Sequence, residues 1–361
     1  MTDIKMMKRL SDAFGPGGFE EDVVKVVQDY TEGFQLSMDS MNNVYIGLKG
    51  NTGDRPMIML DAHLDEVGFM VQSIDQKGLL SIVPLGGWIT TNIPAHSMII
   101  KNRKNEYIKG IVVSKPPHFM TPEEKENNKI HMEELRIDVG CTSREEVIEL
   151  FGIETGDPVV PDVSFSFNEK NGVMSGKGFD NRIGCLAVVE TLKKLSEYKL
   201  DYDVVGALAA QEEVGTRGAQ VTTQVVKPDF AVVFEGSPAD DMYYDEYNAQ
   251  GVLKKVVQIR HMDQSYVSHA GFIHLAQKVG KEKKIKYQSA VRRGGGTNAG
   301  KIHLGNQSVP VLVLGIPSRY VHTHYSYAAI EDMDSAIDLA VETILAMDKE
   351  TMDTLLKKNF L

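Results

Sequence analysis

Residues 204–215 read Val-Val-Gly-Ala-Leu-Ala-Ala-Gln-Glu-Glu-Val-Gly. The apolar run from Val204 to Ala210 predicts a buried strand, and the adjacent carboxylates Glu212 and Glu213 stand where that strand ends. Open α/β sheets bind their ligands in the crevice outside the carboxyl ends of the strands. Because the strand gives way to a loop here, both carboxylates can reach one site in different roles, one as a metal ligand and the other holding a water. The plainer interpretation is a charged loop cap. Similar residues at other strand ends would favour a shared site instead.

The composition is that of an ordinary globular protein. The chain has 361 residues, enough for two domains, with 42% hydrophobic and 25% charged residues. Its net charge of −11 argues against a nucleic-acid-binding protein, which would show a basic face. The two cysteines form no CxxC motif, and the N-terminal sequence lacks the apolar core of a signal peptide. No stretch approaches the roughly 18 apolar residues of a membrane span. We therefore expect a cytoplasmic protein that binds neither nucleic acid nor membrane.

Strand and helix patterns alternate along most of the chain and stop in one region. A second buried strand, at 56–60, ends in Asp61-Ala62-His63-Leu64-Asp65-Glu66, and a third, at 229–234, ends in Glu235. Between about residues 71 and 161, short strand-like runs punctuated by glycine and proline replace the alternation, which is typical of a small β-rich module. The sequence thus predicts an α/β domain formed by residues 1–70 and 162–361, with an inserted β-rich domain at 71–161. It also predicts strands at 252–260 and 309–316 and a polar loop at 121–129.

Residues that can bind metal follow the ends of the predicted strands and the start of one predicted helix. They are imidazoles and carboxylates, without a thiolate. This mixture suits Zn²⁺, Co²⁺ or Mn²⁺ better than Mg²⁺ or Ca²⁺, because imidazole favours the later transition metals. Two imidazoles and three carboxylates suffice for two ions if one carboxylate bridges them. The candidate residues are His63, Asp65, Asp180, Glu212, Glu213, Glu235, His322 and His324.

Each residue type has a chemical reason to be present. Two divalent ions about 3.5–4 Å apart can bind a water between them and lower its pKa. A carboxylate that ligates neither ion must take the proton of that water and pass it to the leaving amine. The pair Glu212 and Glu213 offers one base and one ligand. Asp65, two residues after His63, is the natural acceptor for the other ring nitrogen of that histidine.

Other hydrolytic chemistries find less support. The sequence contains neither a GxSxG nucleophile elbow nor an HExxH zinc motif. Cys141 and Cys185 have no evident histidine partner. Paired carboxylates alone could indicate a glycosidase, but that interpretation leaves His63 and His322 without a role.

Six segments, taken in order, resemble those of the tetrahedral aminopeptidases. These are dinuclear zinc or cobalt metallopeptidases that include bacterial glutamyl aminopeptidases, and some members have been labelled endoglucanases. The resemblance spans nearly the whole chain. The segments are DAHLDEVGFM (61–70), GKGFDNRIG (176–184), AAQEEVGTRGA (209–219), VFEGSPADD (233–241), GGGTNAGKIH (294–303) and SRYVHTH (318–324).

The resemblance implies an architecture and an assembly. The fold would be a three-layer α/β catalytic domain with a mixed central sheet, interrupted by a barrel-like dimerisation domain. Each subunit would hold two divalent metal ions, zinc or cobalt, with manganese as a further candidate. The subunits would form a homo-oligomer in which dimers assemble into a dodecamer with enclosed active sites.

The resemblance also implies roles for individual residues. Asp180 would bridge the two ions, and Glu212 would be the general base. The implied metal ligands are His63, Asp180, Glu213, Glu235 and His322, with Glu213 on one ion and Glu235 on the other.

Three further residues are assigned to the substrate side of the site: His324, Asn298 and Arg319. His324 is the second choice for the last metal ligand and otherwise lines the substrate pocket. Two positions depart from the family pattern, since Glu235 and Asn298 both stand where aspartate is usual. The second change removes a negative charge near the site.

We therefore expect a metal-dependent aminopeptidase that hydrolyses N-terminal residues from short peptides, with a metal-bridged water as nucleophile and Glu212 as general base. An acidic N-terminal residue is the expected preference, with the recognising cation among Arg292, Arg293, Lys301 and Arg319. Two alternatives stay open. One is another metal-dependent hydrolase, such as a deacylase or a glycan-acting enzyme. The other is a metal-binding protein with a decayed site, motivated by the two departures from the family pattern.

Overall fold

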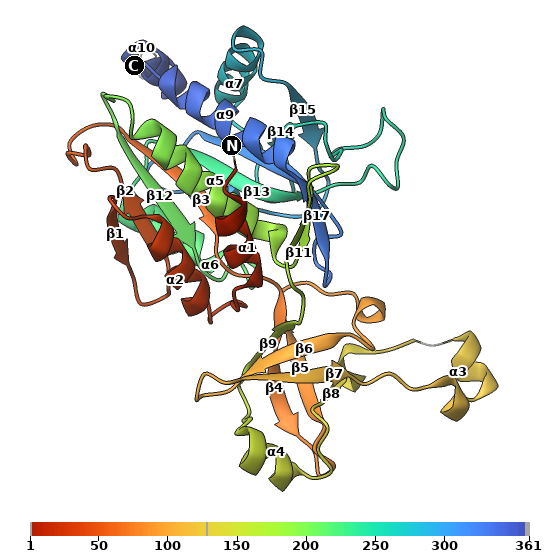
Figure 1. Cartoon of the computed structure of the whole chain (residues 1–361). Coiled ribbons are helices and arrows are strands. Elements are labelled where there is room, and N and C mark those ends of the chain that lie inside the picture. Colours follow the sequence, from red (N-terminus) through yellow and green to blue (C-terminus); the bar gives the residue numbers. More distant parts are fainter. Residues whose placement is uncertain (1, 128, 358–361) are drawn as a thin grey trace.

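The computed structural model describes residues 2–127 and 129–357, which form a larger domain of sheet and helices and a smaller β-barrel (Figure 1). The chain enters the barrel shortly after strand β3 (Met57–His63) and leaves it after β9 (Pro158–Pro161). The predicted fold class, an α/β domain interrupted by a β-rich barrel, is confirmed.

Four parallel strands form the middle of an eleven-stranded sheet in the described part of the large domain. They are β12 (Asp203–Ala209), β3, β13 (Phe230–Pro238) and β16 (Val311–Arg319), side by side in that order. Their apolar residues are buried on both faces, as expected of parallel strands covered by helices. The register pairs Ala209 with His63, so the segments that follow these strands emerge at one edge of the sheet.

Antiparallel strands extend the sheet on both sides, so the sheet is mixed as expected. Beside β12 lie β2 (Val44–Gly47) and β1 (Gln35–Met38). Beyond β16 the sheet continues through β17 (Ser326–Ala329), β11 (Val173–Gly176) and β10 (Ser166–Asn168), each antiparallel to the strand before it. β14 (Val257–Met262) also pairs antiparallel with β16, and β15 (Tyr287–Val291) pairs in parallel with β14.

The strand predicted at 252–260 begins only at Val257. Lys254 and Val256 have left-handed backbones, with φ of 65° and 70°, which no strand accommodates. The N–H groups of these two residues donate to the carboxylate of Asp332 instead of to a neighbouring strand.

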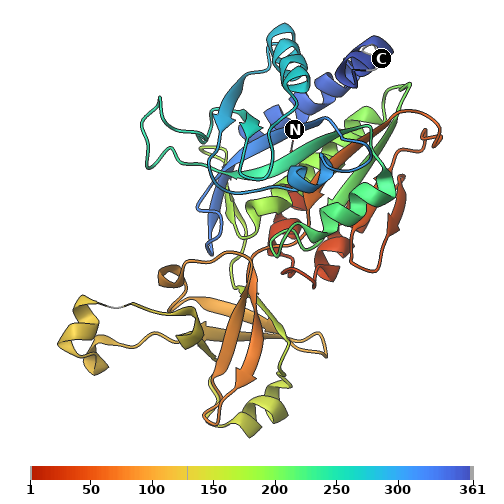
Figure 2. The ribbon, with the colours of Figure 1, turned by 180° about the vertical axis from the view of Figure 1, so that it is seen from behind.

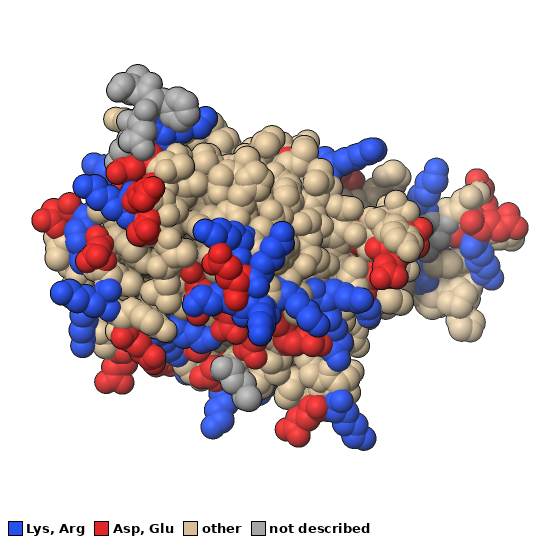
Figure 3. All heavy atoms as spheres, turned by 90° about the horizontal axis from the view of Figure 1, so that it is seen from above, with Lys and Arg blue, Asp and Glu red and all other residues tan. Residues whose placement is uncertain are grey.

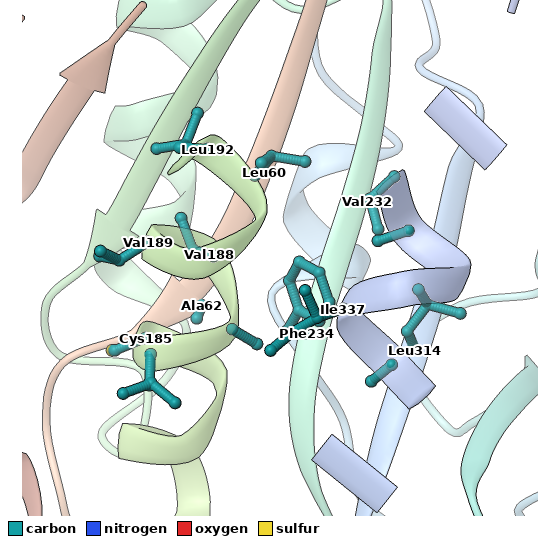
Figure 4. Packing of buried hydrophobic residues seen from close by; sticks show 14 of the residues in the cluster. Leu60, Ala62, Cys185, Val188, Val189, Leu192, Val232, Phe234, Leu314 and Ile337 are labelled. Atoms are coloured by element: carbon teal, nitrogen blue, oxygen red, sulfur yellow. The ribbon is translucent and has the colours of Figure 1, made fainter. Parts of the chain in front are cut away.

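Helices cover both faces of the sheet and create three layers. On one face, α5 (Phe179–Leu195) lies over β3 and β13, with Val188 and Leu192 beside Leu60 (Figure 4). Burying a side chain of this size contributes about 1.5–3 kcal/mol, so this packing holds α5 against the sheet. The same face carries α1 (Ile4–Asp12), α2 (Glu21–Tyr30), α7 (Ala270–Glu282), α9 (Ile330–Leu345) and α10 (Lys349–Leu355). The opposite face carries α6 (Arg217–Val226) and α8 (Ala299–Ile302) (Figure 2).

The barrel is closed and has its own apolar core around Phe69, Ile82 and Ile100. Its strands, in order around the barrel, are β4 (Gly68–Ile74), β5 (Leu80–Leu85), β8 (Arg136–Asp138), β7 (Tyr107–Val112), β6 (Ser97–Lys101) and β9. Helix α4 (Arg144–Phe151) packs on it through Val147.

The polar loop predicted at 121–129 contains a helix, α3 (Pro122–Glu126), so that prediction was wrong over these residues. Thr121 and Glu124 form a capping box, which stabilises a helix start even in a polar segment. Residue 128 lies outside the described residues.

Charged side chains of both signs are intermingled on the face seen from above (Figure 3). Among the residues described, no helix combines the length and the apolar character needed to cross a membrane.

Candidate metal centre

His63 and Asp180 meet where β3 ends and α5 begins. His63 is the last residue of β3 and is 1% exposed. Its Nε2 lies 3.1 Å from Oδ1 of Asp180, the second residue of α5. Two segments 117 residues apart in sequence are thus brought into direct contact by the packing of α5 on the sheet.

The Asp180 carboxylate faces two separate groups. Its Oδ1 faces His63, and its Oδ2 lies 3.5 Å from Nε2 of His322. His322 Nε2 is in turn 3.6 Å from Oε2 of Glu213. His63, Asp180 and Glu213 each offer one ligand atom, and these atoms all lie within 4.8 Å of one another. Imidazole nitrogen and carboxylate oxygen at such separations fit a divalent transition-metal ion.

Asp65 holds the loop that carries the two glutamates. The backbone N–H of Glu212 donates to Oδ1 of Asp65 (2.9 Å), and the N–H of Glu213 donates to Oδ2 (3.0 Å). Oδ1 also lies 3.3 Å from Nδ1 of His63, as the sequence led us to expect, while the backbone oxygen of Asp65 lies 3.1 Å from the same nitrogen. The sequence did not predict the hydrogen bonds from the backbone of Glu212 and Glu213 to Asp65. These bonds join residues 147 and 148 positions apart, so no local sequence pattern indicates them.

The barrel contributes backbone to the site. His322 has a left-handed backbone, with φ of 60°, and its Nδ1 donates to the carbonyl oxygen of Gly87 at 2.9 Å. A Cβ on Gly87 would lie 3.2 Å from that nitrogen, and one on Gly86 would lie 3.2 Å from Cβ of Glu213. Only glycine allows both approaches without displacing a neighbour. In the sequence, nothing distinguishes Gly86 and Gly87 from the other glycines that separate the strand-like runs between residues 71 and 161.

Glu235 lies in the same pocket, on the side of β13. It is 5% exposed, and its Oε2 accepts a hydrogen bond from Nδ2 of Asn181 (3.2 Å). Asn181 also donates to the carbonyl oxygen of Phe234 (2.8 Å) and accepts from the N–H of Gly236 (3.1 Å). The residue that follows Asp180 thus ties the start of α5 to the strand that presents Glu235.

The electrostatics of the site show an excess of buried negative groups. Burial raises the pKa of Glu212 to about 7, with the Asp180 and Asp65 charges adding to the rise and His63 opposing it. Burial and the Asp180 charge raise the pKa of Glu213 and of Glu235 well above the usual range. Buried carboxylates are stable as anions only beside positive charge, which divalent ions would supply.

The buried carboxylates raise the pKa of both histidines, His63 and His322. Burial works against the charged form of His322, but Asp180 and Glu213 outweigh it and raise its pKa to about 10. Burial likewise opposes the charged form of His63, and hydrogen bonding with Asp180 and Asp65 nevertheless raises its pKa well above the usual value. Both imidazoles therefore sit where the local field favours a bound cation, either a proton or a metal ion.

A cavity of 1190 Å³ opens from these residues. Asp180, Glu212, Glu213, Glu235 and His322 line one end of it. The remaining wall is formed by the loop after β13 and the end of β15, and includes Asp240, Tyr244, Asn248, Gln250, Arg260, Val291, Arg292, Arg293 and the glycines 294–296. Small-molecule sites usually span about 300–1,000 Å³, so this cavity has room for more than one amino-acid residue.

Three residues assigned to the substrate side lie apart from the cavity wall. His324 is 2% exposed and stacks on His96 with ring centroids 3.9 Å apart, against the barrel. Nδ2 of Asn298 donates to Oδ2 of Asp61 (2.9 Å), which joins the glycine loop to β3. Arg319 forms an ion pair with Asp241. Of the cations proposed for substrate recognition, Arg292 and Arg293 do line the cavity.

A cluster of histidines and carboxylates at the carboxyl edge of an α/β sheet is the kind of site that metal-dependent hydrolases use. The chain belongs to the M42 glutamyl aminopeptidase family, whose model matches residues 42–339. It is therefore a hydrolase of a metallo-aminopeptidase family, and the resemblance inferred from the sequence is confirmed.

Three relatives show how far the similarity extends. The glutamyl aminopeptidase of Lactococcus lactis is 30% identical over 352 residues, which cover 95% of this chain and 96% of that protein. The structure of a TET aminopeptidase from a marine sediment Thaumarchaeota archaeon superimposes with a TM-score of 0.93 at 35% identity, over 98% of this chain and 99% of that one. The Pyrococcus horikoshii TET1 peptidase has a TM-score of 0.84 at 24% identity over 95% and 99% of the two chains, and is described as assembling into a tetrahedron or a large octahedral shell.

Proposed function

We propose that the protein is an aminopeptidase that uses two divalent metal ions to remove N-terminal residues from short peptides. The observation that carries this proposal is the Asp180 carboxylate, whose two oxygens face His63 on one side and His322 on the other. A carboxylate placed in this way can serve two ions at once. Family membership supports the reaction class.

The ligand set divides around Asp180. Together with Asp180, His63 and Glu235 would bind one ion. Glu213 and His322, again with Asp180, would bind the other. Zinc and cobalt are the preferred candidates, followed by manganese, because two imidazoles join the carboxylates. When bound, such ions lower the pKa of a water and polarise the peptide carbonyl.

Glu212 is the proposed general base. Its Oε2 lies 3.9 Å from Nε2 of His63, so it borders the cluster without joining the group of three mutually close ligand atoms. Burial raises the pKa of Glu212 to about 7, and a base is most effective when its pKa lies near the working pH. Asp65 acts through the backbone of Glu212 and Glu213 and through the ring of His63, as a positioning residue.

An acidic N-terminal residue is the proposed preference. Arg292 donates to the carbonyl oxygen of Pro238, and among the described residues no carboxylate oxygen lies within 4 Å of its guanidinium. Burial and the neighbouring Arg260 lower its pKa to about 10, which leaves it charged at neutral pH. Asp240 and Asp263 attract Arg292 without forming a close ion pair with it, so its guanidinium can still pair with a glutamyl or aspartyl side chain.

We further propose that the barrel, residues 71–161 by the sequence estimate, is a dimerisation domain and that dimers assemble into a tetrahedral dodecamer. The Pyrococcus horikoshii TET1 peptidase, which is described as assembling into a tetrahedron or a large octahedral shell, supports this assembly. Light scattering tests it directly, since a monomeric mass at working concentration would contradict it.

The decisive experiment for the activity is a substrate panel with controlled metal. Chelator-treated protein should lose hydrolysis of aminoacyl-anilides and regain it with Zn²⁺, Co²⁺ or Mn²⁺. N-acyl amino acids and cellulose derivatives in the same panel test the deacylase and glycan-acting alternatives. Full activity in metal-free protein, or turnover of only those other substrates, would overturn the proposal.

A further inference from the structure

The loop between β13 and β14 presents four large side chains to solvent at the rim of the cavity. We call residues 240–251 the tyrosine loop. Met242, Tyr243, Tyr244 and Tyr247 are 56%, 71%, 59% and 93% exposed. The loop projects from the large domain in both views of the chain (Figures 1 and 2). So many exposed aromatic rings within six residues are unusual on a soluble surface and mark a contact site.

Hydrogen bonds hold the two ends of the tyrosine loop together. The N–H groups of Gln250 and Gly251 donate to Oδ1 of Asp240 at 2.8 and 2.9 Å, and the N–H of Asp240 donates to the carbonyl oxygen of Gly251 at 2.9 Å. Compact surface loops with closed ends of this kind frequently carry function. The ring positions are therefore set by a closed backbone and not by burial of the rings.

Two further contacts join the tyrosine loop to the site. Asp241 forms an ion pair with Arg319, which lies three residues before His322 in the chain. Oε1 of Gln250 accepts a hydrogen bond from the N–H of Val291 (2.8 Å), the residue before Arg292. Tyr244, Asn248 and Gln250 line the cavity itself. The loop is thus continuous with the cavity wall, and its rings extend that wall outward.

We propose that the tyrosine loop binds the substrate beyond the scissile bond, and that it favours peptides with apolar side chains at their second and third residues. This inference rests on the proposed aminopeptidase function. The amino terminus of a peptide must reach the end of the cavity that the proposed metal ligands line, so the rest of the peptide leaves over the exposed rim where the rings stand. Tyrosine rings bind apolar side chains through their faces while their hydroxyl groups remain in water.

Charge supports an apolar partner over an acidic one. The loop contains Asp240, Asp241, Asp245 and Glu246 and no lysine or arginine. Asp241 is paired with Arg319, so an acidic second or third residue would meet mainly the negative charge of Asp245 and Glu246. A second copy of the chain is the competing occupant, and the mass of the assembly distinguishes it from a peptide.

The test compares substrates that share their first residue. For the wild type we expect kcat/KM to be about two- to tenfold higher for Leu-Phe-Phe than for Leu-Gly-Gly, mainly through KM, which is the usual value of one or two aromatic contacts. Tyr243→Ala and Tyr247→Ala should reduce that ratio toward one, whereas Tyr247→Phe should keep it. Tyr198→Ala is the matched control, because Tyr198 is 51% exposed and precedes β12, at the opposite edge of the sheet.

The outcomes separate the inference from the proposed function. If the wild type cleaves neither tripeptide, nor a leucyl-anilide, nor a glutamyl-anilide under any metal condition, the proposed function fails. If it cleaves the peptides with equal efficiency, or if Tyr243→Ala and Tyr247→Ala leave the ratio unchanged, the proposal for the loop is wrong. A lower mass of these variants by light scattering would show that the rings contact a second copy of the chain, which also overturns it.

Discussion

Replacing Asp65 by asparagine perturbs the loop of Glu212 and Glu213 without removing a proposed ligand. The carboxylate accepts one N–H from each glutamate, at 2.9 and 3.0 Å, and the Asp65 side chain is fully buried. Asparagine keeps one accepting oxygen and turns an NH₂ group toward the other N–H, so one charge-assisted hydrogen bond is lost. Such a bond is worth about 1.5–3 kcal/mol, which corresponds to a roughly 10–100-fold fall in kcat if the lost contact positions the base.

Metal binding should fall less than turnover in this variant. The backbone oxygen of Asp65 lies 3.1 Å from Nδ1 of His63 and survives the substitution, so the His63 ring keeps one of its two partners. The assay is kcat/KM on an aminoacyl-anilide together with bound metal per subunit at saturating Zn²⁺ or Co²⁺.

Asp203→Asn is the matched control for that experiment. Asp203 is also fully buried and also accepts backbone N–H groups, from Thr52 and Gly53, but it begins β12 at the opposite edge of the sheet. We expect it to lower stability without a specific fall in kcat per bound metal. Turnover of Asp65→Asn within twofold of the wild type, or a loss equal to that of the control, would refute the positioning role.

Three further predictions follow from named contacts. Burial alone would raise the pKa of Asp22, but hydrogen bonds from Lys101, Tyr107 and Lys25 lower it to about 2. The folded-state pKa thus lies below the unfolded value of about 3.9. Ionised Asp22 therefore stabilises the fold by about 2 kcal/mol above pH 4, and this stabilisation is lost as the pH falls toward 2. Urea unfolding of Asp22→Asn should therefore show that deficit at pH 7 and only a small part of it near pH 2, and a deficit constant across this range would contradict the reasoning. Gly87→Ala places a Cβ 3.2 Å from Nδ1 of His322, so metal titration should show weaker binding with an unchanged melting temperature, and wild-type metal affinity would exclude a barrel contribution to the site. Arg292→Gln should lower kcat/KM for glutamyl-anilide about tenfold more than for leucyl-anilide, and an equal effect on both would remove Arg292 from substrate selection.

The arrangement of strands was accessible from the sequence because it rests on local patterns. Uninterrupted apolar runs such as 204–210 and 229–234 indicate strands buried on both faces, and polar residues directly after them can only emerge at the sheet edge. That reasoning placed His63, Glu212 and Glu213 in one region before their contacts were known.

The contacts between distant segments were not accessible in the same way. The carbonyl oxygen of Gly87 meets His322 across 235 residues, and the amide of Asn298 meets Asp61 across 237 residues. Hydrogen bonds of this range depend on the packing of whole elements. For the same reason the sequence could not show that His324 turns toward His96 of the barrel while His322 turns toward Asp180.

The proposed division of labour between Glu212 and Glu213 gives the most direct test of the whole account. Glu212→Gln keeps the shape of the side chain but cannot accept the proton, so metal occupancy should stay near two ions per subunit while kcat falls by about 10²–10⁴. Glu213→Gln should lose metal affinity first, and excess metal should restore part of the activity. Measuring bound metal and kcat for both variants decides the matter. Reversed behaviour would mean that base and ligand are exchanged, and near-normal turnover in Glu212→Gln would show that the pair is only a charged cap on the strand end.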